Sequence, residues 1–234
     1  MKKAIGLICL TLMAGCATPQ KADLSGSLRG VTFANGWGGV KPADYRCDVI
    51  SCEAMEWILG GDLKTVQRAQ IDRLVKVKAD CDKAGKWLEI VLNTNDAENN
   101  QANATAARID GLDYAKQKLG TDIIVQPGSE TRPSAVNWTT VRQHANAIFP
   151  HVVQYGGCGV AGKPWTELHP QSVYDGRCGL PDAPASWIVT DCGPVMADSL
   201  TPAQARVLWK SCGKASFSVY GTKPSASYVN EVFK

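Results

Sequence analysis

Hydrophobic and polar positions follow two alternating patterns along the chain. Short runs rich in β-branched and aromatic residues are apolar through their middles, which is typical of strands buried on both faces of a parallel sheet. Between them lie longer segments whose apolar residues recur every three or four positions, as on one side of a helix. The predicted strands span residues 28–35, 87–94, 122–126, 151–155, 186–191 and 215–220.

Four segments have the helical pattern, and several carry helix start or stop signals. Gly85 and Gly120 follow two of them, at the position where glycine commonly ends a helix. The sequence Thr-Pro-Ala-Gln from residue 201 combines a capping Thr, a Pro at the first helical position and a Gln three residues after the cap. The predicted helices span residues 63–84, 104–119, 138–149 and 201–212.

The alternation of strands and helices predicts right-handed βαβ units and therefore a parallel sheet. Two architectures fit this order. One is a TIM-barrel-like (β/α) barrel, shortened to about six to eight βα units; the other is an open doubly wound parallel sheet. Two more strands could lie within 36–62 and 157–185. Polar or aromatic residues close nearly every predicted strand, which favours the barrel because a barrel gathers all strand ends at one mouth. We expect a single (β/α) domain over 28–234.

The first residues have the pattern of an export signal. Lys2 and Lys3 precede the apolar run 4–14, which is too short to span a bilayer and matches a secretory signal peptide. The following Met-Ala-Gly-Cys16 resembles the lipobox of bacterial lipoproteins.

This resemblance implies that residues 1–15 are removed and that Cys16 is acylated and becomes the N-terminus. Residues 16–27 would then be a lipidated tether, and Ala17 favours the outer membrane. The alternative is an ordinary secreted protein that is cut near Ala17. The expected location is the cell envelope, with a membrane contact through the N-terminal lipid.

Composition excludes several classes of protein. The hydrophobic share of 44% and the charged share of 20% are those of a globular protein, and exclude a disordered, collagen-like or multi-span membrane chain. The net charge of +3 is not gathered in a basic stripe, so we expect no nucleic-acid partner. No GxGxxG follows the first predicted strand and no GxxxxGK[ST] occurs, so a nucleotide site lacks support.

The chain contains nine cysteines, and the export signal would place them in an oxidising compartment, where disulfides persist. Cys9 leaves with the signal peptide, and Cys81 and Cys212 lie on apolar helix faces, where a buried thiol is expected. No zinc site, other metal or cofactor is expected, because there is no pair of CxxC motifs and the His residues lack ligand spacing. The disulfide candidates are two pairs that are close in sequence or bracket a loop, Cys47 with Cys52 and Cys158 with Cys178.

Two segments resemble the large barrel superfamily of retaining glycoside hydrolases. Residues 123–131 run from an apolar strand into Gly128-Ser129-Glu130, where the family has Gly-Asn-Glu and its Glu is the general acid/base. The first strand, which begins with Arg-Gly before an apolar run, is also similar. Ser129 replaces the Asn that contacts the sugar 2-hydroxyl, and the late strand ends at Tyr220-Gly221, without the second Glu of the family.

Glycoside hydrolysis needs two carboxylates. The resemblance implies Glu130 as the proton donor, and Asp191 at the end of a predicted strand is the best partner. Glu167 and Asp96 are alternatives to Asp191. Residues at strand ends or in loops that would contact the sugar are Asn35, Trp37, Asn95, Gln126, Gln154, Tyr155, Trp165 and Tyr220.

The expected function is that of a lipid-anchored envelope protein that hydrolyses or binds a carbohydrate. A second hypothesis is a barrel that lacks catalysis and serves as a binding or envelope-interaction lipoprotein. A third is a structural envelope lipoprotein whose disulfide-stapled loops contact an unidentified protein partner. The separation between Glu130 and a second carboxylate distinguishes the first hypothesis from the second.

Overall fold

The computed structural model of the chain describes residues 19–24, 28–33, 37–53, 62–92, 102–127, 136–152, 195–196, 200–211, 217–221 and 223–234. Within these ranges the strands form one sheet, in which all the pairs are parallel. The strands are β1 Arg29–Phe33, β2 Val49–Glu53, β3 Trp87–Val91, β4 Ile124–Gln126, β5 Val195–Met196 and β6 Phe217–Gly221. The helices are η1 Pro42–Asp44, α1 Leu63–Lys83, α3 Ala104–Leu119, α4 Trp138–Ile148, α5 Pro202–Ser211 and α6 Ala226–Val232.

The strand order, β4-β3-β2-β1-β6-β5, follows the chain in a single sense. Reading from β5, the neighbours are β6, β1, β2, β3 and β4, and a parallel bridge between Val125 and Val152 continues beyond β4. A doubly wound sheet reverses this sense at a switch point. No such reversal occurs among the strands that the structure describes. The described strands leave the sheet unclosed between Val152 and β5.

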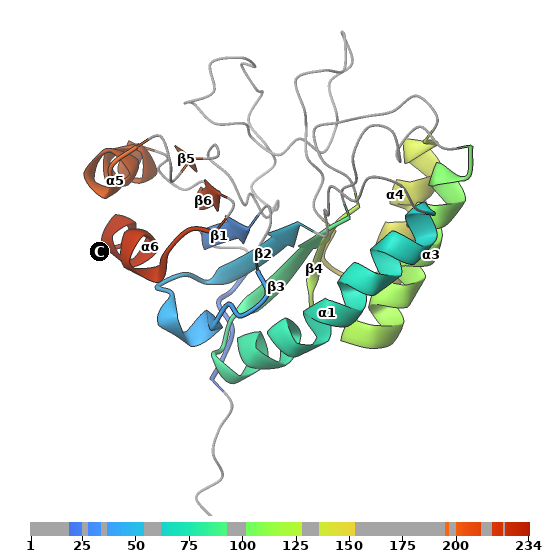
Figure 1. Cartoon of the computed structure of the whole chain (residues 1–234), viewed down its shortest axis with the longest axis horizontal. Helices are drawn as coiled ribbons and strands as arrows, with labels where there is room; N and C mark the ends of the chain where they lie inside the picture. Colours follow the sequence, from blue (N-terminus) through green and yellow to red (C-terminus); the bar gives the residue numbers. More distant parts are fainter. Residues whose placement is uncertain are drawn as a thin grey trace, which may run out of the picture.

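The helices connect successive parallel strands, and right-handed connections between such strands place the helices on one face of the sheet. Figure 1 shows α1, α3 and α4 side by side along one face of the sheet, with α5 and α6 together near β6. The first and last parts of the chain are also joined. β1 pairs with β6, the Tyr45 hydroxyl donates to the Pro224 carbonyl at 3.1 Å, and Asn230 Nδ2 on α6 donates to the Asp44 carbonyl at 2.8 Å.

One face of the sheet forms the main hydrophobic core. Phe33, Ile50 and Ile90 on that face pack with the apolar sides of the helices. Ile71, Leu74 and Cys81 of α1 are fully buried, as their helical spacing predicts. Other buried members of this core from the sheet and the helices are Val31, Cys52, Leu88, Val125, Val219, Leu112, Ala115, Val141 and Ala145.

Most of the predicted elements are confirmed. The four predicted helices are α1, α3, α4 and α5, and Gly85 and Gly120, with φ of 66° and 76°, follow α1 and α3. Thr201 and Gln204 form the expected capping box, with the Thr201 N–H donating to Gln204 Oε1 at 2.9 Å. β2 lies within the segment 36–62, where a further strand was allowed, whereas β5 and α6 match no predicted element. The predicted strand 186–191 lies outside the described residues.

Cys47 and Cys52 are both buried, free thiols. Cys52 is in β2, and Cys47 lies two residues before this strand begins. The expected pairing of Cys47 with Cys52 is therefore wrong. Cys158 and Cys178 lie outside the described residues.

Part of the expected tether is packed against the domain. Ala22 and Leu24 contact a second small cluster of buried side chains from the amino-terminal ends of the strands. Residues 16–18 and 25–27 lie outside the described residues. No helix among the described residues is long and apolar enough to cross a bilayer.

Removal of a side chain from the main core is expected to destabilise the domain. Leu74 is fully buried, and Leu74→Ala leaves a cavity that lowers the free energy of unfolding by about 2–5 kcal/mol. Val75, its neighbour on α1, is 42% exposed, so Val75→Ala should change the free energy by at most about 0.5 kcal/mol. Denaturant titration of both variants checks this, and equal losses would contradict the assigned helix face.

An ion pair beside the first two strands gives a pH-dependent contribution. Asp48 accepts bonds from the Arg29 backbone N–H, Nε and Nη2 at 2.8–2.9 Å. Burial alone would raise the pKa of Asp48, but the bonds to Arg29 hold it below its ordinary value. The unfolded chain therefore binds the proton more readily, and this contribution to stability is present above pH 3.8 and is lost as the pH falls further.

We accordingly expect Asp48→Asn to lower the free energy of unfolding at neutral pH. The free energy of unfolding of this variant should also fall less steeply as the pH is lowered into the acid range. Urea titrations from neutral pH to well below pH 3.8 measure both effects. An unchanged acid slope in Asp48→Asn would show that other carboxylates govern it.

Candidate binding site on the inner face of the sheet

The face of the sheet opposite α1, α3 and α4, here called the inner face, carries a row of polar residues. Strand register aligns Tyr220 of β6, Thr32 of β1, Ser51 of β2 and Glu89 of β3. Because alternate side chains of a strand share a face, the residues two positions further along point the same way. These are Glu53 of β2 and Gln126 of β4, which are aligned with Val91 of β3 between them.

Most of these polar side chains are buried, although parallel strands are usually apolar on both faces. Thr32 is 8% exposed, Ser51 2% and Glu89 1%. Thr32 Oγ1 and Ser218 Oγ are hydrogen-bonded at 2.7 Å. Burial of polar groups is unfavourable unless they are bonded. Their concentration toward the carboxyl ends of parallel strands, where α/β proteins bind ligands, marks this face as the candidate site.

Two carboxylates face each other diagonally across β2 and β3. Ser51 is aligned with Glu89, so Glu53 lies two residues closer to the carboxyl end on the neighbouring strand. The strand spacing of about 4.8 Å and the rise of about 3.3 Å per residue place the two Cα atoms about 8 Å apart. Side chains of this length can bring the carboxyl groups within the ~5–9.5 Å that glycoside hydrolysis requires.

Neither Glu53 nor Glu89 was among the site residues predicted from the sequence. Glu89 lies within the predicted strand 87–94, where it is the single charge in the apolar run Trp-Leu-Glu-Ile-Val. A buried charge within such a run was the signal that could have found it. Glu53 lies in the segment 36–62, where a strand was allowed but its bounds and register were not predicted, so its position beside Glu89 follows only from the strand pairing.

Arg108 of α3 joins the carboxyl ends of two strands. It is only 1% exposed, and its Nη1 donates to the Leu92 carbonyl at 2.5 Å and to the Pro127 carbonyl at 2.9 Å. Leu92 and Pro127 directly follow β3 and β4, so the guanidinium holds these two strand ends together. Burial lowers the pKa of Arg108 to about 9, and the group is still charged at neutral pH.

Trp37 was expected to stack on a sugar, and this expectation is wrong. The side chain is packed in the main core with 3% exposure, and its Nε1 donates to the Glu53 carbonyl at 3.0 Å. The Arg73 guanidinium lies 4.7 Å from the centre of the ring. The ring therefore lies in the core on the helix side of the sheet and not on the inner face, where a ligand of this site would bind. Its role is to hold the end of β2 that carries Glu53.

Two other expected contact residues lie on the inner face. Gln126 is at the carboxyl end of β4 with 6% exposure, and Tyr220 of β6 is half-buried beside Thr32. The remaining residues named from the sequence lie outside the described residues; they are Glu130, Asp191, Glu167, Asp96, Asn35, Asn95, Gln154, Tyr155, Trp165 and Cys16. Among the described residues, no group of three or more His, Cys, Asp or Glu could hold a metal ion.

Comparison with known proteins gives little additional information. No family model matches the sequence, and no curated protein matches it. Among solved structures, the catalytic domain of Thermobifida fusca endoglucanase Cel5A (E5) is similar, with a TM-score of 0.44 and 13% sequence identity. The likeness covers 88% of this chain and 74% of that chain. Likeness at this level assigns neither the fold nor the activity.

The role of Arg108 can be tested by its removal. Arg108→Met leaves the Leu92 and Pro127 carbonyls without this donor, and each unbonded carbonyl costs about 1–3 kcal/mol of stability. Arg68→Met is a matched control, because Arg68 of α1 bonds Asp110 at the surface and its loss should have a small effect. Denaturant titration compares the two. Equal stability of both variants would show that the strand ends do not depend on Arg108.

Proposed function

We propose that this protein is a cell-envelope lipoprotein whose domain binds and hydrolyses a carbohydrate at the carboxyl ends of its parallel strands. The observation that carries the proposal is the polar inner face, on which hydroxyl, amide and carboxylate groups lie in adjacent rows. Sugars present many hydroxyl groups that both donate and accept hydrogen bonds. A few fixed polar side chains of these kinds can orient such a ligand.

The proposed fold is a closed (β/α) barrel. Its support is the circular strand order, in which the first strand lies between the second and the last. The unclosed gap falls between Val152 and Val195, and the sequence predicts a strand at 186–191 within that interval. One or more strands from 153–194 would complete the barrel, and the inner face would become its interior.

The proposed reaction is cleavage of a glycosidic bond by two carboxylic groups. One gives its proton to the bridging oxygen as the carbon–oxygen bond breaks, and the other activates water or attacks the sugar carbon directly. Resemblance supports Glu130 as the proton donor and position at a predicted strand end supports Asp191 as its partner. Glu53 and Glu89 are a second candidate pair, supported by their diagonal placement on the inner face.

One observation favours a second function, glycan binding without hydrolysis. The resembled family has its second Glu at the end of a late strand, whereas β6 ends with Tyr220 and Gly221. Tyr220 is aligned with Thr32, on the same face as the other polar residues. A phenol there can bond and stack with a sugar, but it does not replace a carboxylate in hydrolysis.

The membrane attachment is proposed from the lipobox-like sequence that ends at Cys16. Acylation of this cysteine would hold the domain on the envelope without a membrane-spanning segment. The outer membrane is favoured by Ala17.

Binding is tested with residues 17–234, which lack the acylated Cys16, and a panel of envelope polysaccharides. Gln126→Leu and Tyr220→Phe should each weaken binding about two- to tenfold, since one neutral hydrogen bond contributes about 0.5–1.5 kcal/mol. Val207→Ala on α5, where the side chain is 67% exposed, should bind as the parent does. Calorimetric titration measures all three. A folded parent that binds no glycan would contradict the proposal.

Hydrolysis is tested separately by release of reducing ends from the bound polysaccharide. Glu130→Gln should abolish it while binding persists, because the amide cannot give up a proton as the acid does. If Glu130→Gln remains active and Glu89→Gln does not, the catalytic pair lies on β2 and β3. Binding without hydrolysis by the parent would support the second function.

A further inference from the structure

The N-terminal segment, residues 19–24, is fixed to the end of the domain where the strands begin. We call this end the amino-terminal pole and define it by the segment itself, the turn 84–86 between α1 and β3, and the turn 120–123 before β4. Ala22 and Leu24 pack on the apolar side chains there. The Ala22 carbonyl accepts a bond from Trp87 Nε1 at 2.8 Å.

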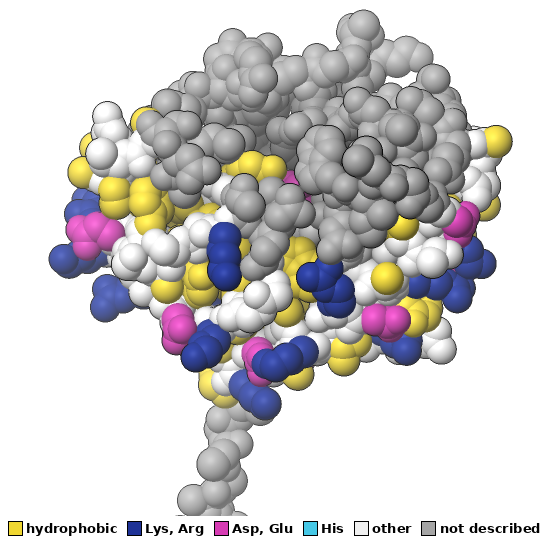
Figure 2. Space-filling model, viewed as in Figure 1, with side chains coloured by type: hydrophobic (Ala, Val, Ile, Leu, Met, Phe, Trp, Pro, Cys, Tyr) yellow, Lys and Arg dark blue, Asp and Glu magenta, His cyan; other side chains and the backbone are white. Residues whose placement is uncertain are grey.

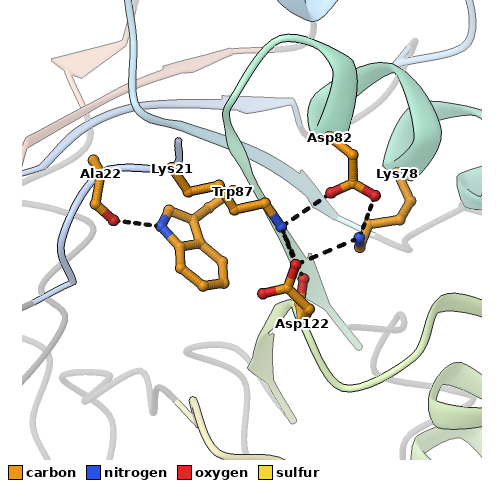
Figure 3. Close-up of polar contacts among 6 residues, drawn as sticks. All are labelled: Lys21, Ala22, Lys78, Asp82, Trp87 and Asp122. Carbon is orange, nitrogen blue, oxygen red and sulfur yellow. Dashed lines mark hydrogen bonds and ion pairs between the residues drawn. The ribbon is translucent and has the colours of Figure 1, made fainter. Parts of the chain in front are cut away.

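Lys21 is the main polar contact of this segment. Figure 3 shows its ammonium group between the Trp87 ring and the carboxylates of Asp82 and Asp122. Lys21 Nζ lies 3.0 Å from Asp82, 2.5 Å from Asp122 and 4.5 Å from the centre of the Trp87 ring. The side chain is only 14% exposed. Burial lowers the pKa of Lys21, but its bonds to Asp122 and Asp82 raise it above the ordinary value overall, so the group is charged at neutral pH.

Pro19 adds a close contact at the same pole. Gly85 has a φ of 66°, and a Cβ added there would lie 2.7 Å from the Cβ of Pro19. The turn after α1 therefore approaches the segment so closely that only glycine fits both the space and the backbone angle. The chain is thus held from Pro19 through Leu24.

These contacts limit how far the domain can move from an anchor at Cys16. Three residues, fully extended, span at most about 11 Å, so Cys16 lies within that distance of Pro19. We infer that the amino-terminal pole faces the lipid bilayer and that the candidate site, at the opposite ends of the same parallel strands, opens away from it. This inference rests on the proposed acylation of Cys16.

Basic side chains near this pole have acidic partners. We therefore expect the lipid anchor, rather than attraction to anionic lipid, to hold the pole at the membrane. Lys83 has an acidic neighbour in Asp80, and Lys118 lies 3.5 Å from Asp72. On the face seen in Figure 2, basic and acidic side chains of the described residues lie close to one another. Such mixed charge gives little net attraction to a bilayer. The site would then meet glycans beyond the membrane surface rather than lipid head groups.

The orientation is tested with the full chain, exported and acylated, on vesicles of neutral phosphatidylcholine. Lys83, at the end of α1, lies at the amino-terminal pole and its side chain is 80% exposed. Lys64, at the start of α1, lies toward the carboxyl ends of the strands and its side chain is 48% exposed. Both are labelled with an amine-specific reagent and quantified by mass spectrometry. The ratio of Lys83 to Lys64 labelling should fall several-fold on vesicles relative to the unacylated chain 17–234 in solution, at low and high salt alike.

An unchanged or increased ratio on vesicle-bound protein would overturn the orientation. Vesicle flotation and the mass of the N-terminal peptide report the anchor separately. An unacylated chain that does not float would overturn the anchor and the orientation with it, while glycan binding could still be measured in solution.

A variant of Lys21 tests whether the contacts of this segment set the orientation. Lys21→Met removes the ammonium group, and Asp82 keeps its bond to Lys78 at 2.6 Å, so the fold should persist. The acylated variant should float as before, but the fall in the labelling ratio should shrink. Lys21→Arg, which keeps the charge, should restore it. An identical fall in Lys21→Met would show that this ion pair does not orient the domain.

Discussion

The structure depends on the difference between the two faces of its parallel sheet. One face carries the apolar side chains of the main core, and the other carries the polar rows of the candidate site. The main core needs the apolar face, because α1, α3 and α4 bury their own apolar sides against it. The opposite face is then left for Thr32, Ser51, Glu89 and Gln126. A shift of one strand by one residue would exchange the two sets. Burial in the core therefore also fixes the polar rows of the candidate site.

Two buried side chains fix the backbone at the carboxyl ends of the strands, and this backbone carries the polar rows. Arg108 holds the ends of β3 and β4 through two carbonyls, and Trp37 bonds the carbonyl of Glu53 at the end of β2. Both side chains are nearly inaccessible to water. Their contribution is to position backbone that carries the site. A site whose supporting side chains are themselves locked by packing keeps its geometry when a ligand arrives.

The sequence predicted the helices well because their information is local. Leu74 and Cys81 recur at helical spacing, and Gly85 and the Thr201–Gln204 cap mark helix ends within a few residues. The inner face could not be predicted in the same way, because Glu53 and Glu89 become neighbours only through strand pairing. Trp37 and the cysteine pair failed for a related reason. An aromatic side chain beside glycines does not reveal that it will be buried, and the closeness of Cys47 and Cys52 in the sequence does not reveal that both thiols stay free.

The two ends of the strands have different roles in this arrangement. At the amino-terminal ends, Lys21 and Trp87 join the incoming chain to α1 and to the turn before β4. At the carboxyl ends lie the polar rows and Arg108. All the strands that the structure describes are parallel, so their amino-terminal ends lie on one side of the sheet and their carboxyl ends on the other. If Cys16 is acylated as proposed, the short segment at the amino-terminal end would determine which way the opposite end faces, without taking any residue from the candidate site.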